Sequence, residues 1–262
     1  MLGEAVRDLR GLTRGEILEP GDGAYEVARA AYNAMATGRP VAILRPADLP
    51  DIVAAVRWAA ASDLAIGVRG GGHSVAGHSS PDGALLIDLS RWRGATVDPA
   101  AGTADALAGS RLMDLDAATS AHELAAPSGT YVDTGIGGLT LSGGISYLLP
   151  TEGYACDALI GAELVTAGGE VLQVDEAREP ELLWALRGGG GNFGVVTHLR
   201  YRLGTSRSCT AASCGSTAIA SSRWSNARSR TTRRRPTSWP CRWSPGDPRR
   251  ASPGHVPRRL AR

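Results

Sequence analysis

Three glycine-rich runs contain the residues best suited to chemistry. They read RGGGHSVAGH at 69–78, GIGGLTLSGGI at 135–145 and RGGGGNFGVVT at 187–197. Glycine has no side chain, so such loops expose backbone N–H groups that can hold the oxygens of a diphosphate. Composition alone explains any one run about equally well, because the chain has 34 glycines. Three runs in one domain favour a phosphate-containing ligand.

The first run does not fit a Rossmann dinucleotide site. That fingerprint places its glycines between a strand and a helix, with an acidic residue about 20 positions later. Here the run continues through HSSPDG into the apolar segment 84–89, which predicts a second strand. A Rossmann NAD site is therefore disfavoured.

Several other chemistries lack the residues they need. The sequence contains no Lys, which removes P-loop, protein-kinase and Schiff-base chemistry. The four cysteines have no C-x-x-C spacing, and we interpret Cys156 as a buried thiol. His73 and His78 have no third partner, so no metal site is expected. The N-terminal residues have no apolar run and no segment has the length of a membrane span, which predicts a cytoplasmic protein without a membrane partner.

The elements that must position the first run form a predicted βαβ unit. Strands are expected at 39–46 and 64–68, and the helix between them has Asp48 as its cap and Pro50 in its first turn. Its apolar face is expected to hold Ile52, Val53, Val56 and Ala60.

The later elements alternate strands with short helices. We expect hairpins around 99–102 and across 162–172, the second with Gly168 and Gly169 as a primed turn. A helix is predicted from Arg111 to His122, and a short helix and a strand on either side of 188–194. The run at 135–145 is expected to be a second glycine loop. The predicted fold class is α+β with two strand-rich subdomains.

The three runs, in this order and spacing, resemble the vanillyl-alcohol-oxidase-like flavoproteins. The closest branch is similar to the berberine-bridge-enzyme-like oxidases. The resemblance implies a PCMH-type FAD-binding domain of two α/β subdomains over residues 37–204, after an N-terminal segment at 1–36. It also implies that FAD lies between the subdomains and that His73 is bonded to the 8α-methyl carbon of its isoalloxazine. A neutral imidazole nitrogen is a suitable nucleophile near pH 7.

Many members of this family add a second bond from a cysteine just before the middle run. Tyr131 occupies that position here, and Cys156 lies too far along the chain to replace the cysteine. The resemblance therefore implies attachment through His73 alone.

The resemblance also implies a set of cofactor-binding residues. Ser142, just before Gly143 and Gly144, stands at a position where glycine is commoner in the family. The serine is therefore expected to need a negative φ. Val195 and Val196 match a stretch beside the adenine. The full set is Arg69, Gly70, Gly71, Gly72, His73, Ser74, Tyr131, Thr134, Gly137, Gly138, Thr140, Gly143, Gly144, Val195 and Val196.

The family pattern stops at Gly204. Residues 1–204 have 15 basic and 25 acidic residues, whereas the remainder has 13 basic residues and only Asp247 as an acid. Residues 205–262 are rich in Arg, Ser and Pro and poor in aliphatic residues, which predicts a disordered basic tail. We interpret the tail as a frameshift or a wrong gene end. The rival interpretation, a nucleic-acid-binding arm with Trp224, Trp239 and Trp243 as stacking groups, is disfavoured.

Three function classes remain open. The first is an FAD-dependent oxidase that takes a hydride from a small CH–OH or similar substrate, with molecular oxygen as the acceptor. The second is an inactive flavin-binding fragment that lacks the substrate domain, in which case the catalytic residues are missing. The third is a noncovalent FAD reductase, which His73 in its motif disfavours.

Overall fold

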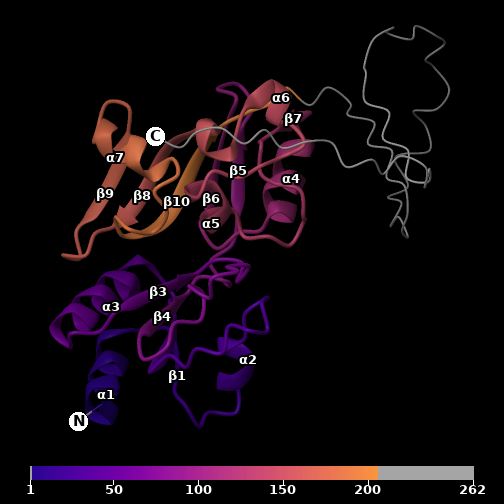
Figure 1. The fold of residues 1–262 in the computed structure, drawn as a ribbon. Coiled ribbons are helices and arrows are strands. Elements are labelled where there is room, and N and C mark those ends of the chain that lie inside the picture. The colour runs from indigo at the N-terminus through magenta and orange to yellow at the C-terminus, as the bar shows by residue number, and fades with distance from the viewer. Residues whose placement is uncertain (1, 206–262) are drawn as a thin grey trace, which may run out of the picture. The chain divides into compact units, whose positions relative to one another are not determined.

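The computed structural model describes residues 2–205, and the side chains of residues 6–205. The expected tail falls almost entirely outside this range. The described part contains two subdomains, each built on its own sheet (Figure 1). The elements of the first are α1 (Leu2–Leu12), β1 (Glu16–Leu18), α2 (Tyr25–Arg29), β2 (Ala42–Arg45), α3 (Leu49–Ala61), β3 (Ile66–Arg69) and β4 (Leu85–Asp88).

The first sheet has the strand order β1-β2-β4-β3. In this order β4 lies between β2 and β3, the two strands that α3 connects. All three strands run parallel. Asp48 caps α3 as expected, because its side chain accepts a hydrogen bond from the backbone N–H of Asp51 at 3.1 Å. The predicted strand, helix and strand are therefore confirmed.

The buried face of α3 differs from the expected one at a single position. Ile52, Ala55, Val56 and Ala59 are buried, whereas Ala60 is exposed. Ala60 was therefore wrongly predicted, because a residue eight positions after Ile52 lies at the edge of the helix face and Ala59 packs there instead.

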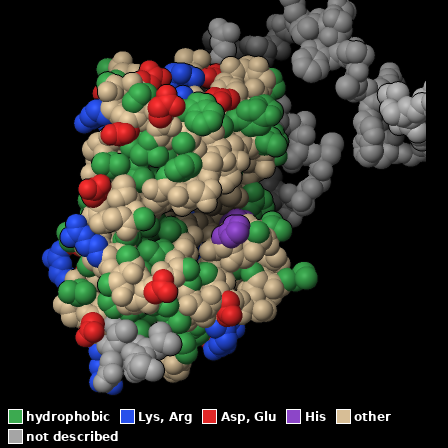
Figure 2. Space-filling model, turned by 60° about the vertical axis from the view of Figure 1, so that its left-hand side comes forward, with side chains coloured by type: hydrophobic (Ala, Val, Ile, Leu, Met, Phe, Trp, Pro, Cys, Tyr) green, Lys and Arg blue, Asp and Glu red, His purple; other side chains and the backbone are tan. Residues whose placement is uncertain are grey.

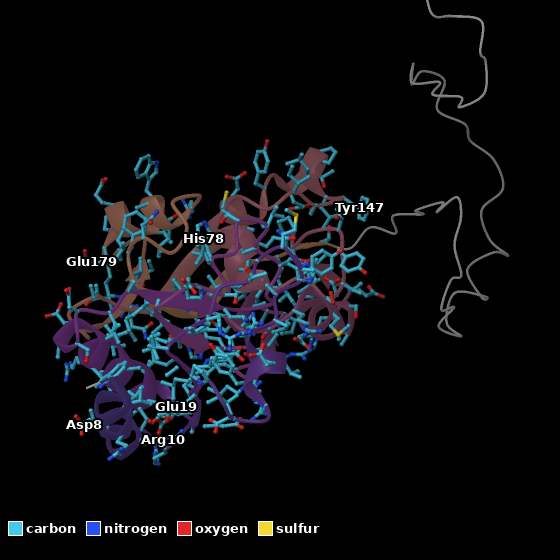
Figure 3. The ribbon with its side chains drawn as sticks, turned by 60° about the horizontal axis from the view of Figure 1, so that its bottom comes forward. Asp8, Arg10, Glu19, His78, Tyr147 and Glu179 are labelled. Carbon is cyan, nitrogen blue, oxygen red and sulfur yellow. The ribbon has the colours of Figure 1, made fainter. Side chains whose placement is uncertain are left out.

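Residues assigned to the N-terminal segment form part of the first subdomain. Strand β1 pairs with β2 in an antiparallel register, and the side chains of Leu9 and Tyr25 are fully buried. The Tyr25 hydroxyl donates a hydrogen bond of 2.7 Å to the carbonyl of Pro40. Arg10 and Glu19 form an ion pair on the outer surface at the end of the subdomain remote from His78 (Figure 3).

The second subdomain follows the first along the chain. Its sheet has the order β5-β6-β10-β8-β9, and all four pairings are antiparallel. Its elements are β5 (Ala95–Asp98), β6 (Thr103–Leu107), α4 (Leu112–Ser120), β7 (Leu124–Ala125), α5 (Ile136–Leu141), α6 (Leu149–Glu152), the 3-10 helix η1 (Ala155–Ala158), β8 (Leu159–Val165), β9 (Val171–Asp175), α7 (Pro180–Leu186), β10 (Val195–Arg202) and β11 (Gly204–Thr205).

The turn between β8 and β9 is not the expected primed turn. The backbone N–H of Thr166 donates to the carbonyl of Glu170, and the N–H of Gly169 donates to the carbonyl of Thr166. Of the two glycines only Gly169 has a positive φ, +76°. A three-residue loop closed by a left-handed glycine needs only that one glycine, whereas a type I′ turn needs positive φ at two positions.

The middle glycine run is also not a simple loop. Residues Ile136–Leu141 form the short helix α5, and only the residues after it take loop conformations. Ser142 has φ of −110°, as its side chain requires, and Gly143 follows with φ of +105°. The prediction of a continuous loop was wrong because Ile136, Thr140 and Leu141 have buried side chains that a helix turns into the core.

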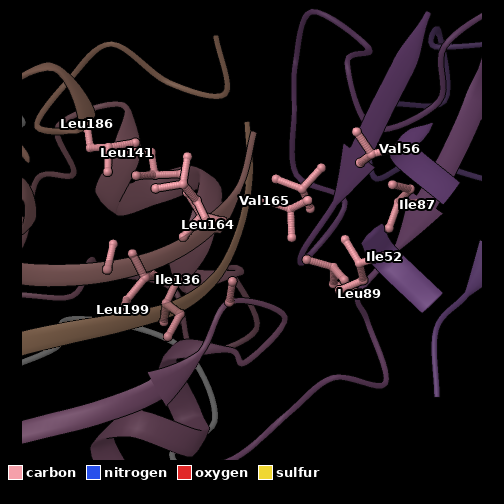
Figure 4. Packing of buried hydrophobic residues seen from close by; sticks show 14 of the residues in the cluster. Ile52, Val56, Ile87, Leu89, Ile136, Leu141, Leu164, Val165, Leu186 and Leu199 are labelled. Atoms are coloured by element: carbon pink, nitrogen blue, oxygen red, sulfur yellow. The ribbon is translucent and has the colours of Figure 1, made fainter. Parts of the chain in front are cut away.

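The two subdomains share one hydrophobic core. Val165 at the end of β8 extends toward Ile52 and Leu89 of the first subdomain (Figure 4). These three residues belong to one cluster of buried apolar side chains that also includes Leu164 and Leu199. The shared core holds the ends of β3 and α5 in a fixed relation. No helix in the described part is long and apolar enough to cross a membrane.

Candidate functional site

A cavity of about 910 Å³ lies where the two subdomains meet. Ligand pockets are typically 300–1,000 Å³. In the space-filling view the surface here is hollowed and mostly tan, with a histidine beside it (Figure 2). The tan colour reflects the backbone and small polar groups of the lining.

Parts of all three glycine runs line this cavity. From the expected set, the lining includes Gly70, Gly71, Gly72, His73, Ser74, Thr134, Gly137, Gly138, Gly144 and Val196. The cavity does not bring in Arg69, Tyr131, Thr140, Gly143 or Val195.

The first two runs cross with their backbones in contact. A Cβ built on Gly71 would lie 2.6 Å from the Cα of Gly135 and would overlap its backbone nitrogen. A Cβ on Gly135 would likewise overlap the backbone of Gly71. Glycine is required at both positions because any side chain would force the two loops apart. This crossing brings His73 and α5 to the same cavity.

The cavity lining offers hydrogen-bond donors and no negatively charged side chain of a described residue. The backbone N–H groups of residues 71–74 donate no hydrogen bond to any described residue. Among the described residues that line the cavity there is no Asp or Glu. The buried hydroxyl of Ser79, another lining residue, has no hydrogen-bond partner in the described part. A diphosphate with a polar organic group fits these features, since it supplies acceptors to unpaired donors.

There is also room for such a ligand against the backbone of α5. A Cβ built on Gly138 would meet no atom of the described residues within 4 Å. Gly137 and Gly138 belong to the first turn of α5, where N–H groups have no acceptor within the helix.

His73 is held from two sides. Its ring stacks on Tyr32 with a centroid distance of 4.4 Å and an interplanar angle of 17°. Its Nε2 lies 3.3 Å from Oδ1 of Asp133, and the ring of Tyr131 is tilted at a centroid distance of 6.2 Å. The backbone N–H of Tyr32 donates to the carbonyl of Gly72 at 3.0 Å, which fixes the stacking partner to the same loop. Tyr131 therefore lies beside His73 although it does not line the cavity.

Arg69 supports the first run from behind. Its buried guanidinium donates to the carbonyls of Ala28, Arg29 and Ser79. Burial is the main cause that lowers the pKa of Arg69. The side chain thus ties the first run to the two backbone segments at 28–29 and 79, and it is not available to a ligand.

Thr140 and Val195 also have structural positions. The Thr140 hydroxyl lies 2.8 Å from the hydroxyl of Tyr201, and both side chains are fully buried. Burial raises the pKa of Tyr201 above its ordinary value. This pair joins α5 to β10. Val195 is buried in the shared core.

The cavity also includes residues outside the expected set. Gly188, Gly189, Gly190, Gly191 and Asn192 line it from the third run, from which the sequence had assigned only Val195 and Val196 to the site. The backbone N–H of Gly190 donates to the carbonyl of Leu141 and connects this loop to α5. Ser79 had no sequence signal, because its unpaired hydroxyl is visible only once the loop is folded.

In the described part of the chain, no group of three or more His, Cys, Asp or Glu residues could hold a metal ion. Cys156 is buried and free, as expected, and burial is the main cause that raises the pKa of its thiol.

Comparison with known proteins connects this cavity to one cofactor. The family model described as "FAD binding domain" matches residues 40–175, just over half of the chain. The (R)-6-hydroxynicotine oxidase of Paenarthrobacter nicotinovorans is 36% identical over 72% of this chain and 42% of its own length.

Solved structures give the same relationship. BBE-like 1 of Physcomitrella patens has a TM-score of 0.73 at 30% identity, over 78% of this chain and 44% of that chain. Glucooligosaccharide oxidase of Acremonium strictum, with its 6-S-cysteinyl, 8α-N1-histidyl FAD, has a TM-score of 0.70 at 30% identity. The match covers 77% of this chain and 42% of that chain. The chain thus spans less than half the length of these relatives. It belongs to the family of FAD-binding-domain proteins that includes the FAD-linked and BBE-like oxidases, and FAD is the cofactor that its glycine-lined cavity fits.

Proposed function

We propose that this chain is the FAD-binding part of an oxidase whose flavin is bonded to His73. The observation that carries the proposal is the position of His73, which lines the glycine cavity directly after Gly72. The relatives named above include an oxidase of a nicotine derivative and an oxidase of an oligosaccharide. The proposed substrates are therefore small molecules with an oxidisable CH–OH or CH–N group.

The residues of this chain bind and orient the cofactor. The free N–H groups of residues 71–74 and the first turn of α5 hold the diphosphate, and His73 fixes one edge of the ring system. When bound, the flavin accepts a hydride from the substrate and passes the electrons to molecular oxygen. Within residues 2–205 the titratable side chains that line the cavity are His73 and His78, and we assign neither as the base for the substrate.

The surroundings of His73 support a single covalent bond. Tyr131 occupies the position that the family resemblance gives to a second, cysteinyl attachment, and its ring lies beside His73. Cys156 does not line the cavity, and its raised pKa makes it a poor nucleophile. Attachment through His73 alone is therefore part of the proposal.

The test compares His73→Ala with His78→Ala in the full chain. His78 also lines the cavity but is exposed, which makes it a matched control. After incubation with FAD in air and acid precipitation, we expect flavin fluorescence in the pellet for the wild type and the control, and in the supernatant for His73→Ala.

Flavin that stays in the His73→Ala pellet would contradict the assignment of His73. Flavin released from all three proteins would support the alternative of a noncovalent FAD reductase. A chain that binds no FAD would support the inactive fragment. A cytoplasmic location, expected from the sequence, stays a prediction.

A further inference from the structure

The carboxylate of Asp133 has an unusual position beside His73. Its Oδ1 is buried and has no hydrogen-bond partner among the described residues, although Nε2 of His73 lies 3.3 Å away. The pair lies within ion-pair distance but does not have the geometry of a hydrogen bond. A buried acceptor without a donor is unfavourable, and Nε2–H of His73 is the donor that a small ring rotation would supply.

This contact distinguishes the two ring nitrogens. In a neutral imidazole one nitrogen carries the proton, and the hydrogen bond made by that nitrogen selects the tautomer. A proton on Nε2 satisfies Oδ1 of Asp133, whereas a proton on Nδ1 would turn the Nε2 lone pair toward a carboxylate oxygen. Nδ1 makes no hydrogen bond with any described residue, so its lone pair stays free.

The stacking partner limits how the ring can respond. Tyr32 lies parallel to the imidazole, so a large rotation of the ring out of its plane would break the 4.4 Å stack. A small rotation about the Cβ–Cγ bond keeps the stack and changes the angle at which Nε2–H meets Asp133. The ring is therefore guided to the orientation in which Nε2 faces the carboxylate.

We propose that Asp133 is the positioning residue for flavin attachment, because it holds Nε2 of His73 and leaves Nδ1 free to bond, the nitrogen that corresponds to the 8α-N1-histidyl FAD of glucooligosaccharide oxidase. This inference rests on the proposed function and extends it by naming the residue that orients His73 for attachment.

The step balances with molecular oxygen as the oxidant. A bond forms between Nδ1 and the 8α-methyl carbon, and one C–H bond of that methyl group breaks. The methyl group and the imidazole each lose one proton. The two electrons of the broken C–H bond pass through the flavin ring to oxygen, which takes up both protons and becomes hydrogen peroxide. Asp133 stabilises the positive charge that the imidazole gains when Nδ1 attacks, and its carboxylate is placed to accept the Nε2 proton.

The experiment measures the rate of covalent attachment in the full chain. Apoprotein from a riboflavin-auxotrophic host is mixed with FAD in air, and acid-stable flavin is followed over time for the wild type, Asp133→Ala and Asp133→Asn. Asp105→Asn is the matched control, because Asp105 pairs with Arg200 on the exposed surface. Noncovalent FAD affinity is measured separately by fluorescence before attachment.

We expect Asp133→Ala to slow attachment about tenfold or more, the size of effect found when a carboxylate that orients a metal-bound histidine is removed. Asp133→Asn should be intermediate, because the amide oxygen still accepts Nε2–H but carries no charge. Noncovalent affinity should stay unchanged in both variants. NMR of the flavin peptide from the wild type should show the bond at Nδ1.

Attachment at the wild-type rate in Asp133→Ala, or a bond at Nε2, would overturn this inference and leave attachment through His73 intact. A wild type that holds FAD only noncovalently would overturn the assignment of His73 and this inference together. The position of the bond is measured on the wild type, so the test does not depend on the folding of either variant.

Discussion

Gly71 and Gly135 touch through their backbones, and this contact is the point where the two subdomains build one site. A Cβ on Gly71 would lie 2.6 Å from the Cα of Gly135, and the reverse substitution meets Gly71 in the same way. The two residues are 64 positions apart, so the contact also fixes two distant parts of the chain. The glycines act through their small size, because they let the loops approach closely enough to share a ligand.

Alanine at either position should therefore destabilise the fold. For Gly71→Ala and Gly135→Ala we expect a loss of about 1–3 kcal/mol in the free energy of unfolding, the usual cost of inserting a group into a packed region. Denaturant unfolding measures this loss. Gly23→Ala is the control, because a Cβ there meets nothing within 4 Å, and its change should stay below about 0.5 kcal/mol. Equal stabilities for all three variants would show that the loops do not cross as described.

A larger side chain at Gly138 should block the cofactor without disturbing the fold. The position is open toward the cavity, so Gly138→Leu has space for its side chain only where the ligand would lie. We expect FAD affinity to fall at least tenfold, or about 1.4 kcal/mol, with an unchanged melting temperature. Titration of FAD fluorescence measures the affinity, with Gly23→Leu as the remote control. Unchanged affinity would place the cofactor elsewhere.

The Thr140–Tyr201 pair should contribute to stability and not to cofactor binding. Tyr201→Phe leaves the buried Thr140 hydroxyl without its partner, which should cost about 1–3 kcal/mol. Thr140→Val in the same chain should recover part of that loss, because no unpaired hydroxyl remains. A double-mutant cycle from denaturant unfolding checks this coupling. The FAD affinity of both single variants should equal that of the wild type. A large loss of FAD affinity in Thr140→Val would mean that Thr140 contacts the ligand.

The ion pair of Asp114 with Arg93 should make stability depend on acid pH. The Asp114 carboxylate oxygens accept hydrogen bonds from the Arg93 guanidinium at 2.6 and 2.9 Å. The hydrogen bond from Arg93 is the largest cause that lowers the pKa of Asp114. A pKa that is lower in the folded state stabilises the fold above the unfolded pKa of about 3.9, and this contribution is lost as pH falls through the folded value.

Asp114→Asn should accordingly lower the stability at pH 7 and reduce the loss of stability between about pH 4 and pH 2. Unfolding by denaturant across this pH range measures the difference. Glu170→Gln removes an exposed carboxylate that has no ion pair in the described part, and it should leave the profile unchanged. An identical pH profile for Asp114→Asn would contradict the role of the pair.

The sequence was sufficient for the elements whose signals are local. Asp48 and Pro50 marked the start of α3, and the glycine runs marked the loops that line the cavity. The partners of Arg69 and Thr140 could not be predicted in this way, because Ala28 and Tyr201 are distant in sequence and come close only in the folded chain. The same holds for Asp133, whose relation to His73 depends on the crossing of the two glycine runs.

The most direct test of the whole account is the intact mass of the purified full chain after exposure to FAD in air, followed by peptide mapping. We predict a mass equal to that of the sequence plus one FAD less two hydrogens, with the added mass on the peptide that contains His73. A mass equal to that of the sequence alone, or flavin on a peptide without His73, would contradict the account.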